Sequence, residues 1–580
     1  MKHSWIAQTR RLITRGRRRV TLARGGVPLA LVTGALLALA SVATAQVGTE
    51  THPASPPTPL NTIRPRTPPP AAPAWRGQRP AEPENQPSGP RFIVNHIGFV
   101  GNSILPDKEL SRIAKPYEKR RVTLDNLREL CLKIRDDYKS KGYILARAGV
   151  PPQKIKNGNV YLAISEGRFG RIRIRGTDRY SPQFIRKMFS PAVDVGVVRL
   201  DAVQRALLIM SEFPELQVRS FFEIGNKPGT TDLVLKVEDD SPWHVGFDYD
   251  NFGSDLVGRN RAGLSLWGGH LLTDGDQIYI HATHPFPGDS NPYYQGSYSI
   301  PVGRYGTQLH FGYSTATTTV GQELAILDIR GDAEVANATL THPLKRTLRK
   351  TSDLALGFVT KDVMNFVFND VLVSNDKLRM FTLGYSANWI GDSSRTVASA
   401  VVTQGLGAAF RGTENGSVLS SRPGSDAGND FSKINLNLAH LAKLGDRHFL
   451  LFRSATQQTI DALAVPEQFA IGGPNSVRGF IQSEFLADYG YNLSGEYRYS
   501  VVDDDPFTLQ TAVFVDGGSG TIKNPLLGEV VNRDLIGAGV GLRASHSDRV
   551  SARIDVGFPI KGREIDDENH VIYGQMSSRF

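Results

Sequence analysis

The residues that could do chemistry in this sequence lie around one glycine-rich segment. Residues 469–480 contain two adjacent glycines and end with Val477-Arg478-Gly479-Phe480. This run lies within residues 460–488, which interrupt an otherwise regular series of short alternating strands. Loops of that length are usually functional or disordered, and this one is too apolar to be a solvated tail. Its arginine needs a carboxylate partner, because an unpaired guanidinium is costly to desolvate.

Two carboxylates on the next predicted strands are expected to lie opposite the lipid face. In the strand that begins near Phe507, alternation places Phe514 and Asp516 opposite an apolar face. That face consists of Phe507, Leu509, Thr511, Val513 and Val515. In the strand that begins near Tyr489, Glu496 lies opposite a face formed by Tyr491, Leu493, Gly495, Tyr497 and Tyr499. The alternative is that both are ordinary charges lining a wet lumen.

The sequence lacks the residue patterns of common catalytic and cofactor sites. It has no Gly-x-Ser-x-Gly elbow, no His-Glu-x-x-His helix, no phosphate-binding loop and no cysteine cluster, and its 13 histidines are scattered. Gly517-Gly518-Ser519-Gly520 follows a predicted strand without a helix after it, so we interpret it as a turn rather than a phosphate site. We therefore expect no enzymatic activity, no bound metal and no cofactor.

Residues 1–45 have the pattern of a secretory signal peptide. Eight basic residues and no acidic residue precede an apolar run over 27–42, and Ala43-Thr44-Ala45 follows the run. The Arg10-Arg11 pair suggests a twin-arginine signal, but a barrel protein should cross the inner membrane unfolded, which favours the general secretory route. The peptide carries eight of the ten units of net positive charge, so the high pI is no argument for a nucleic-acid partner.

A proline-rich linker over 46–91 precedes two similar α+β domains, 92–167 and 168–240. The linker holds 13 prolines between 53 and 90 and almost no core-forming side chains. In the first domain, hydrophobic periods predict strands over 92–100, 143–148 and 160–165 and helices over 105–114 and 123–141. In the second domain they predict strands over 171–175, 218–224 and 232–237 and helices over 182–188 and 200–213. Thr123 is the expected N-cap of the longest helix, and Cys131 a core residue on its apolar stripe. Open strand edges in these domains could take up an extended peptide.

From residue 241 to the C-terminus the sequence predicts a membrane barrel. Sixteen alternating strands begin near residues 244, 260, 277, 293, 307, 325, 351, 376, 395, 430, 448, 489, 507, 534, 549 and 570. An even number of strands can close a sheet that lipid would otherwise leave with a free edge. The many charged residues on the strand faces opposite the apolar ones disfavour a soluble β-sandwich, because its core would not tolerate so many charges. The expected fold class is therefore an all-β transmembrane barrel of 16 antiparallel strands preceded by two α+β domains.

The motif Val477-Arg478-Gly479-Phe480 resembles the V-R-G-F/Y motif of the loop that folds into the barrel in the outer-membrane protein-assembly superfamily. Together with two domains that resemble polypeptide-transport-associated (POTRA) repeats, it makes residues 92–580 similar to the TpsB-type transporters of two-partner secretion. In that family the loop arginine pairs with the aspartate of an F-x-D motif on the thirteenth strand, here Phe514-Val515-Asp516. The resemblance thus makes Asp516 the first candidate partner of Arg478, and Glu496 is a second candidate. The terminal Phe580 resembles the signal that hands such barrels to their assembly machinery. The family often begins with a plug helix, and residues 46–91 show no amphipathic run for one.

The resemblance implies a function and a location. We expect a monomeric protein in outer-membrane lipid, with its two POTRA domains in the periplasm and no nucleic-acid partner. Its partners would be an unfolded secreted exoprotein, such as an adhesin, haemagglutinin or haemolysin, and the barrel-assembly machinery during biogenesis. An insertase for other barrels is the alternative, disfavoured because those relatives usually carry more periplasmic repeats. A diffusion porin is a third class, in which an inward loop and periplasmic repeats would serve no evident purpose.

Overall fold

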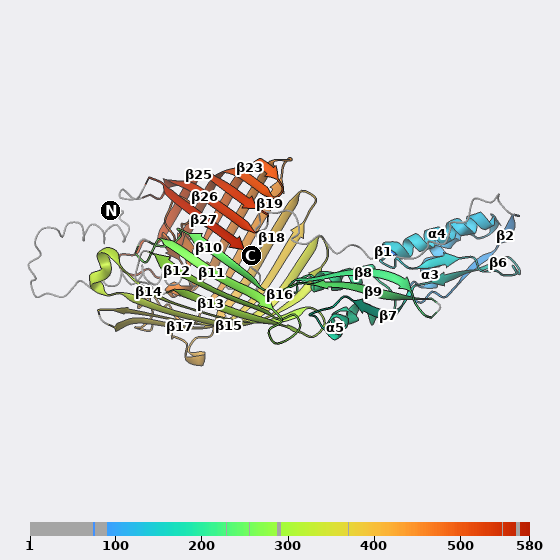
Figure 1. Ribbon diagram of the computed structural model, residues 1–580, viewed down its shortest axis with the longest axis horizontal. Helices are drawn as coiled ribbons and strands as arrows, with labels where there is room; N and C mark the ends of the chain where they lie inside the picture. The colour runs from blue at the N-terminus through green and yellow to red at the C-terminus, as the bar shows by residue number, and fades with distance from the viewer. Residues whose placement is uncertain are drawn as a thin grey trace, which may run out of the picture.

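The computed structural model describes residues 74–75 and 90–580, except 228, 255, 287–291, 369, 548 and 564–568. The predicted signal peptide, 1–45, and all but two residues of the predicted linker up to residue 89 lie outside the described residues. Figure 1 shows a barrel from one end of which two smaller domains extend in a row. In the described part of the chain, no helix is long and apolar enough to cross a membrane.

Sixteen strands in the described residues form a closed antiparallel barrel, which confirms the predicted fold class. Neighbours along the chain pair in order, and β10 pairs with β27 to close the ring; Phe580 and Val245 exchange backbone hydrogen bonds at the end of that seam. The strands are β10 His244–Asp250, β11 Asn260–Gly269, β12 Gln277–Phe286, β13 Tyr293–Val302, β14 Thr307–Thr319, β15 Arg330–Arg346, β16 Lys350–Val367, β17 Val371–Ile390, β18 Ser394–Gly405, β19 Ser432–Lys443, β20 His448–Thr459, β23 Tyr489–Asp504, β24 Phe507–Thr521, β25 Asn532–His546, β26 Val550–Lys561 and β27 Val571–Arg579.

Most of the predicted strand starts lie within two residues of the observed ones, and two lie five residues away. Strand β15 begins at Arg330 rather than near 325, because residues 322–327 form a short 3-10 helix. Strand β17 begins at Val371 rather than near 376, because the β16–β17 hairpin stays paired as far as Val367 and Val371. Alternating hydropathy marks only the part of a strand that meets lipid, so it misses pairing that continues beyond the membrane.

Strand alternation sorts side chains to the two faces of the barrel wall as predicted. On β24, Val513 and Val515 are exposed on the outer face, whereas Phe514 and Asp516 are buried inside. On β23, Tyr491 and Leu493 are likewise exposed, and Glu496 is buried. The outer face is therefore apolar where lipid would contact it, and the polar face lines the lumen.

The predicted turn at residues 517–520 is wrong. These four residues continue strand β24 as far as Thr521 and pair with residues 490–493 of β23. Gly518 and Gly520 are glycines for a different reason, which is the close approach of the inner segment 460–488. A Cβ on Gly518 would lie 2.7 Å from the Ile471 side chain, and one on Gly520 would lie 2.6 Å from the Ala487 side chain.

The first α+β domain packs two helices against a three-stranded sheet in the order β3-β6-β5. Its elements are β2 Phe92–Val94, β3 His96–Val100, α3 Asp107–Ala114, a 3-10 helix Lys115–Tyr117, β4 Arg120–Val122, α4 Leu124–Ser140, β5 Arg147–Gly149 and β6 Asn159–Ser165. Thr123 caps α4 in a reciprocal capping box with Asn126. Cys131 lies in the core, and burial raises the pKa of its thiol to about 11. The strand predicted over 143–148 is shorter, because the chain turns at Gly142 and joins the sheet only at Arg147.

The second α+β domain has a sheet in the order β1-β8-β9-β7, covered by two helices. Its elements are β7 Arg168–Arg175, α5 Pro182–Val193, α6 Leu200–Met210, β8 Leu216–Ile224 and β9 Thr230–Asp239. Strand β1, Ala74–Trp75, comes from the predicted linker and pairs in parallel with Phe221 and Phe222 of β8. The edge of β8 that the sequence left open therefore carries a strand of the same chain.

The second domain is attached to the end of the barrel by ion pairs and apolar contacts. Arg346, at the end of β15, lies 2.5 Å from the Glu212 carboxylate and 2.6 Å from that of Asp353. Arg205 donates to the Pro343 carbonyl at 2.9 Å. These contacts hold the sheet of this domain beside the barrel mouth (Figure 1).

Glu166 joins the end of β6 to the loop before α3 in the first domain. Its buried carboxylate accepts hydrogen bonds from the backbone N–H of Ser103 at 2.7 Å and of Ile104 at 2.8 Å, and from the Tyr138 hydroxyl at 2.9 Å. Burial raises the pKa of Glu166, but the hydrogen bonds from Ser103, Ile104 and Tyr138 outweigh it and hold the pKa below its usual value. The ionised form is thus the one that the fold stabilises.

Replacing Glu166 with Gln should destabilise the first domain by about 1–3 kcal/mol at pH 7, because buried donors lose a charged acceptor. Since the folded pKa is lowered, this contribution is complete above the ordinary Glu pKa of about 4.3. It disappears as the pH falls through the lowered folded value. Hydrogen exchange of residues 92–167 in the whole protein measures the difference. Glu129→Gln, which changes an exposed carboxylate on α4, is the control; an equal loss of protection in both variants would contradict the prediction.

Candidate functional site

The connection between β20 and β23, residues 460–488, lies inside the barrel and is called the inner loop below. It contains a 3-10 turn Val465–Glu467 and a small hairpin in which β21 Phe469–Ile471 pairs with β22 Phe485–Ala487. Its buried apolar side chains form a cluster with two residues of the barrel wall. That cluster consists of Ile471, Val477, Phe480, Phe485, Ala487, Ile522 and Leu535. The inner loop is therefore packed like a small core rather than held loosely in the lumen.

Arg478 is fully buried and is bound at every edge of its guanidinium group. Its Nε lies 2.6 Å and its Nη2 3.0 Å from the two Asp516 oxygens, which makes a bidentate pair, and its backbone N–H donates to Asp516 at 3.1 Å. Its Nη1 lies 2.6 Å from Glu496, and its Nη2 donates to the Ser494 hydroxyl at 3.3 Å. The ring centroid of Phe514 lies 3.3 Å from the guanidinium carbon. The structure thus brings Arg478, Phe514, Asp516 and Glu496 together.

The two carboxylates belong to a larger ionic network on the lumen face of β23 to β26. Glu496 also lies 2.6 Å from Arg498 and 3.1 Å from Arg543. A third carboxylate, Asp555, lies 2.7 Å from Arg543 and 2.5 Å from Arg553. Sequence reasoning missed Asp555 and its two arginines. The signal was available in the sequence, because Arg553 and Asp555 alternate with the apolar residues Ile554 and Val556 along β26 and so lie on the lumen face.

The backbone on both sides of Arg478 presses against a part of the wall that lacks side chains. A Cβ on Gly537 of β25 would lie 1.9 Å from the Arg478 carbonyl oxygen, and one on Gly557 of β26 would lie 2.5 Å from the Gly479 nitrogen. The Tyr573 hydroxyl of β27 accepts from the Gly479 N–H at 3.0 Å and donates to the Phe480 carbonyl at 2.6 Å. Each residue of the Val477-Arg478-Gly479-Phe480 motif is thus fixed by packing, ion pairing or backbone hydrogen bonds.

A second set of buried ion pairs anchors the start of the inner loop to strands β16 and β19 of the barrel. The Glu467 carboxylate lies 2.7 Å from the Lys361 ammonium on β16 and 2.7 Å from the Lys433 ammonium on β19. Lys361 also donates to the Pro466 carbonyl at 3.0 Å. All three charged side chains are largely buried. Sequence reasoning singled out residues 460–488 but did not find this partner set, which lies 34 or more residues away along the chain.

A third anchor lies at the end of the inner loop, where Asp488 is fully buried. Its carboxylate accepts from the Leu463 N–H at 3.0 Å and the Lys523 N–H at 2.6 Å. It also lies 3.1 Å from the guanidinium of Arg422, a fully buried residue of the long connection between β18 and β19. Nothing in the sequence around Arg422 distinguishes it from a solvated loop arginine.

This arrangement holds a segment in place rather than assembling a reaction centre. The carboxylates of Glu467, Asp488 and Asp516 each form an ion pair with a guanidinium or ammonium group. No group of metal-ligating side chains occurs among the described residues. Removing one member of a buried pair typically costs about 3–5 kcal/mol, because the other charge stays buried. The inner loop is therefore stable where it lies and could move only if several charges exchanged partners together.

Gly537→Ala tests whether close packing against the wall holds the loop without altering any charge. The added Cβ would collide with the Arg478 carbonyl oxygen, so we expect the loop tip to become mobile. The measurement is the line shape of a spin label at Asn475→Cys, in a Cys131→Ser background that removes the other cysteine. Gly574→Ala on β27 is the matched control, because a Cβ there meets nothing within 4 Å. Equal label mobility in both variants would show that the wall does not position the loop.

Comparison with known proteins agrees with this geometry. The family model of the haemolysin secretion/activation protein ShlB/FhaC/HecB matches residues 229–544, and that of the ShlB-type POTRA domain matches residues 92–167. The heme/hemopexin transporter protein HuxB of Haemophilus influenzae is 22% identical, over 85% of this chain and 88% of that protein. The outer membrane transporter CdiB of Dickeya dadantii is 24% identical, over 83% of this chain and 85% of that protein.

A solved structure has the same fold. CdiB from Escherichia coli matches with a TM-score of 0.72 at 22% identity and covers 87% of this chain and 93% of its own. The family match alone spans more than half of the sequence. The chain therefore belongs to the haemolysin secretion/activation protein ShlB/FhaC/HecB family of outer-membrane transporters, which carry their POTRA domains in the periplasm.

Proposed function

We propose that this protein exports one unfolded partner polypeptide, an adhesin, haemagglutinin or haemolysin-like exoprotein, through its barrel to the cell surface. The observation that carries the proposal is the inner loop, which lies in the lumen and is held there by the buried Arg478 network. A channel for small solutes would not need a movable segment packed in this way. The second POTRA domain is held at the periplasmic mouth by contacts such as Arg346–Glu212, and together with the first it would supply a receptor at that end of the barrel.

Recognition would use strand addition to the second POTRA domain. An extended peptide can add to a sheet edge through backbone hydrogen bonds, with little dependence on its sequence. The edge strand β8 already pairs with Ala74–Trp75 of the linker, so an incoming peptide at that edge must displace two residues of the transporter itself. Displacement of so short a strand costs few hydrogen bonds. The linker then acts as a weak competitor that keeps the edge from pairing with unrelated chains.

Passage through the barrel would follow movement of the inner loop. Arg478 and Asp516 define its resting position, and Glu496 offers a second carboxylate on the neighbouring strand when the pair separates. No nucleotide hydrolysis is available in the periplasm, so folding of the emerging polypeptide outside the cell would give the transport its direction.

A charge-swap experiment tests the role of the Arg478–Asp516 pair. Arg478→Asp places a carboxylate among Glu496, Asp516 and Asp555, so we expect export to fall at least 10-fold. Adding Asp516→Arg restores the opposite charges and should recover part of the export. The readout is the amount of the secreted partner in the culture medium, with the partner taken as the large exoprotein encoded beside the transporter.

Barrel assembly is checked in the same strains by measuring the transporter in outer-membrane fractions. Arg349→Asp, at an exposed pair with Asp392, is the matched control. Full export by the Arg478→Asp single variant would overturn the proposed role of the loop. Depletion of the whole protein separates export from the insertase alternative, because loss of one secreted protein supports export, whereas loss of many outer-membrane proteins supports an insertase.

Replacing Ala74 and Trp75 with Gly-Ser should strengthen peptide binding to the second POTRA domain. The two substituted residues pair less well with β8, so the edge opens to the partner. The measurement is the dissociation constant of a fluorescent peptide from the partner's secretion domain, with a fall of about 3-fold or more expected. The same change at Ala81 and Glu82 is the control. Weaker binding after removal of β1 would mean that the linker strand belongs to the receptor instead of competing for it.

A further inference from the structure

The ionic network around the inner loop holds more positive than negative charge. Five arginines lie close together in this part of the lumen, against the three carboxylates Glu496, Asp516 and Asp555. The arginines are Arg453, Arg478, Arg498, Arg543 and Arg553. Each carboxylate is already bound by at least one of the last four. Among these eight described side chains the arginines outnumber the carboxylates by two, and a buried charge is costly without a counter-ion.

Among the described residues, Arg453 is the arginine of this group without an ion pair. It projects from β20 towards the lumen, and in the described part of the chain it forms no ion pair. Its Nη2 reaches the Ser494 hydroxyl at 3.5 Å, and its buried Nε has no hydrogen-bond partner there. Arg478 and Arg553 lie near enough to repel it electrostatically, and Glu496 and Asp516 lie near enough to attract it, although neither carboxylate forms an ion pair with it among the described residues. A guanidinium with an unused donor, facing other cations, is an incomplete site for an anion.

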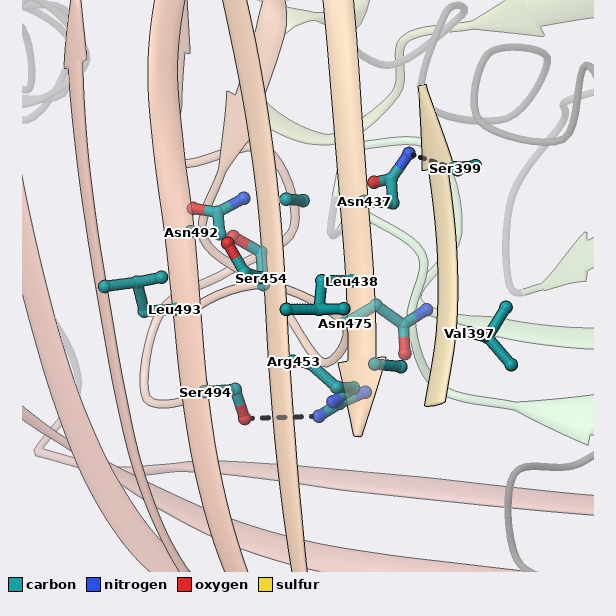
Figure 2. Close-up of a pocket in the computed structure, with 13 residues that line it drawn as sticks. Val397, Ser399, Asn437, Leu438, Arg453, Ser454, Asn475, Asn492, Leu493 and Ser494 are labelled. Atoms are coloured by element: carbon teal, nitrogen blue, oxygen red, sulfur yellow. Dashed lines mark hydrogen bonds between the residues drawn. The ribbon is translucent and has the colours of Figure 1, made fainter. Parts of the chain in front are cut away.

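A cavity of about 240 Å³ opens beside this guanidinium. Figure 2 shows Arg453 and Ser494 joined across neighbouring strands, with Asn475 of the inner loop and Asn437 of β19 among the other labelled lining residues. The polar side chains on the lumen side of the lining include Ser399, Asn437, Arg453, Asn475, Asn492 and Ser494, and no carboxylate is among the lining residues. Since one water occupies about 30 Å³ of liquid, the space takes a small anion together with several waters.

We propose that this cavity is an anion-binding site, with Arg453 as its cation and the neighbouring amide and hydroxyl groups as further hydrogen-bond donors. The ligand is an oxyanion or carboxylate. It can come from solution, as an inorganic anion in the resting channel, or from a passing polypeptide, as an Asp or Glu side chain. In both cases it supplies charge that the wall lacks, next to the loop tip and within reach of the Arg478 network.

The site can be tested on the whole purified protein in planar bilayers without any exported partner, so the result does not depend on the proposed function. Sodium sulfate is titrated at constant KCl concentration while the channel current is recorded. We expect a saturable decrease in current for the wild type and at least a 10-fold higher half-maximal sulfate concentration for Arg453→Gln. Arg453→Lys keeps the charge and should fall between the two.

Arg261→Gln is the matched control, because Arg261 also faces the lumen but pairs with Asp250 at 2.8 Å. It should keep the wild-type sulfate response. A current that falls linearly with sulfate, or equally in the wild type and in Arg453→Gln, would overturn the site and leave only diffuse charge screening.

The source of the ligand is distinguished by adding short peptides of the form Gly-Asp-Gly or Gly-Asn-Gly at fixed sulfate. Relief of the sulfate effect by the Asp peptide alone supports a site that also takes side-chain carboxylates. The same effect of both peptides, with saturable sulfate binding intact, overturns the carboxylate part and restricts the site to inorganic anions.

Discussion

A buried arginine cannot be left without partners, and much of this barrel is arranged around that constraint. Arg478 is out of contact with water, so desolvation must be offset by hydrogen bonds and opposite charge. Asp516 and Glu496 supply both from neighbouring strands, and Phe514 covers the flat face of the guanidinium. The same requirement repeats at Glu467 and at Asp488, which have cationic partners from β16, β19 and an outer connection. The inner loop is thus fixed at three charged points around an apolar cluster.

Anchoring by ion pairs differs from anchoring by an apolar core. An apolar core resists sliding, because every displaced side chain loses its contacts at once. Ion pairs can exchange partners, and the wall offers alternatives: Glu496 already contacts three arginines, and Asp555 lies 3.6 Å from Arg478 as well as beside two others. The energetic difference between neighbouring pairings is smaller than the cost of leaving a charge unpaired. A loop held in this way can have more than one well-defined position in the lumen.

The sequence predicts well what repeats and poorly what depends on contact between distant segments. Period-two alternation alone located the sixteen strands and placed Phe514 and Asp516 on the inside, because lipid imposes the same rule on every strand. The pairing of Arg422 with Asp488 left no such pattern, since its two members lie 66 residues apart. Glycine was ambiguous for a physical reason: residues 517–520 have the composition of a turn, yet they are small to admit Ile471 and Ala487. The pairing of Ala74–Trp75 with β8 was equally hidden, because a two-residue strand has no periodicity.

The glycines that receive the inner loop also determine what the lumen would look like without it. Gly518, Gly520, Gly537 and Gly557 lie on three adjacent strands, and no side chain projects from any of them. If the loop moved aside, this sector would present bare peptide groups to whatever passed. At these four glycines a bulky residue would meet no side chain, although Phe514, Asp516 and Asp555 lie on the same strands. The glycines that admit the inner loop would thus leave a smooth strip of wall beside a charged one.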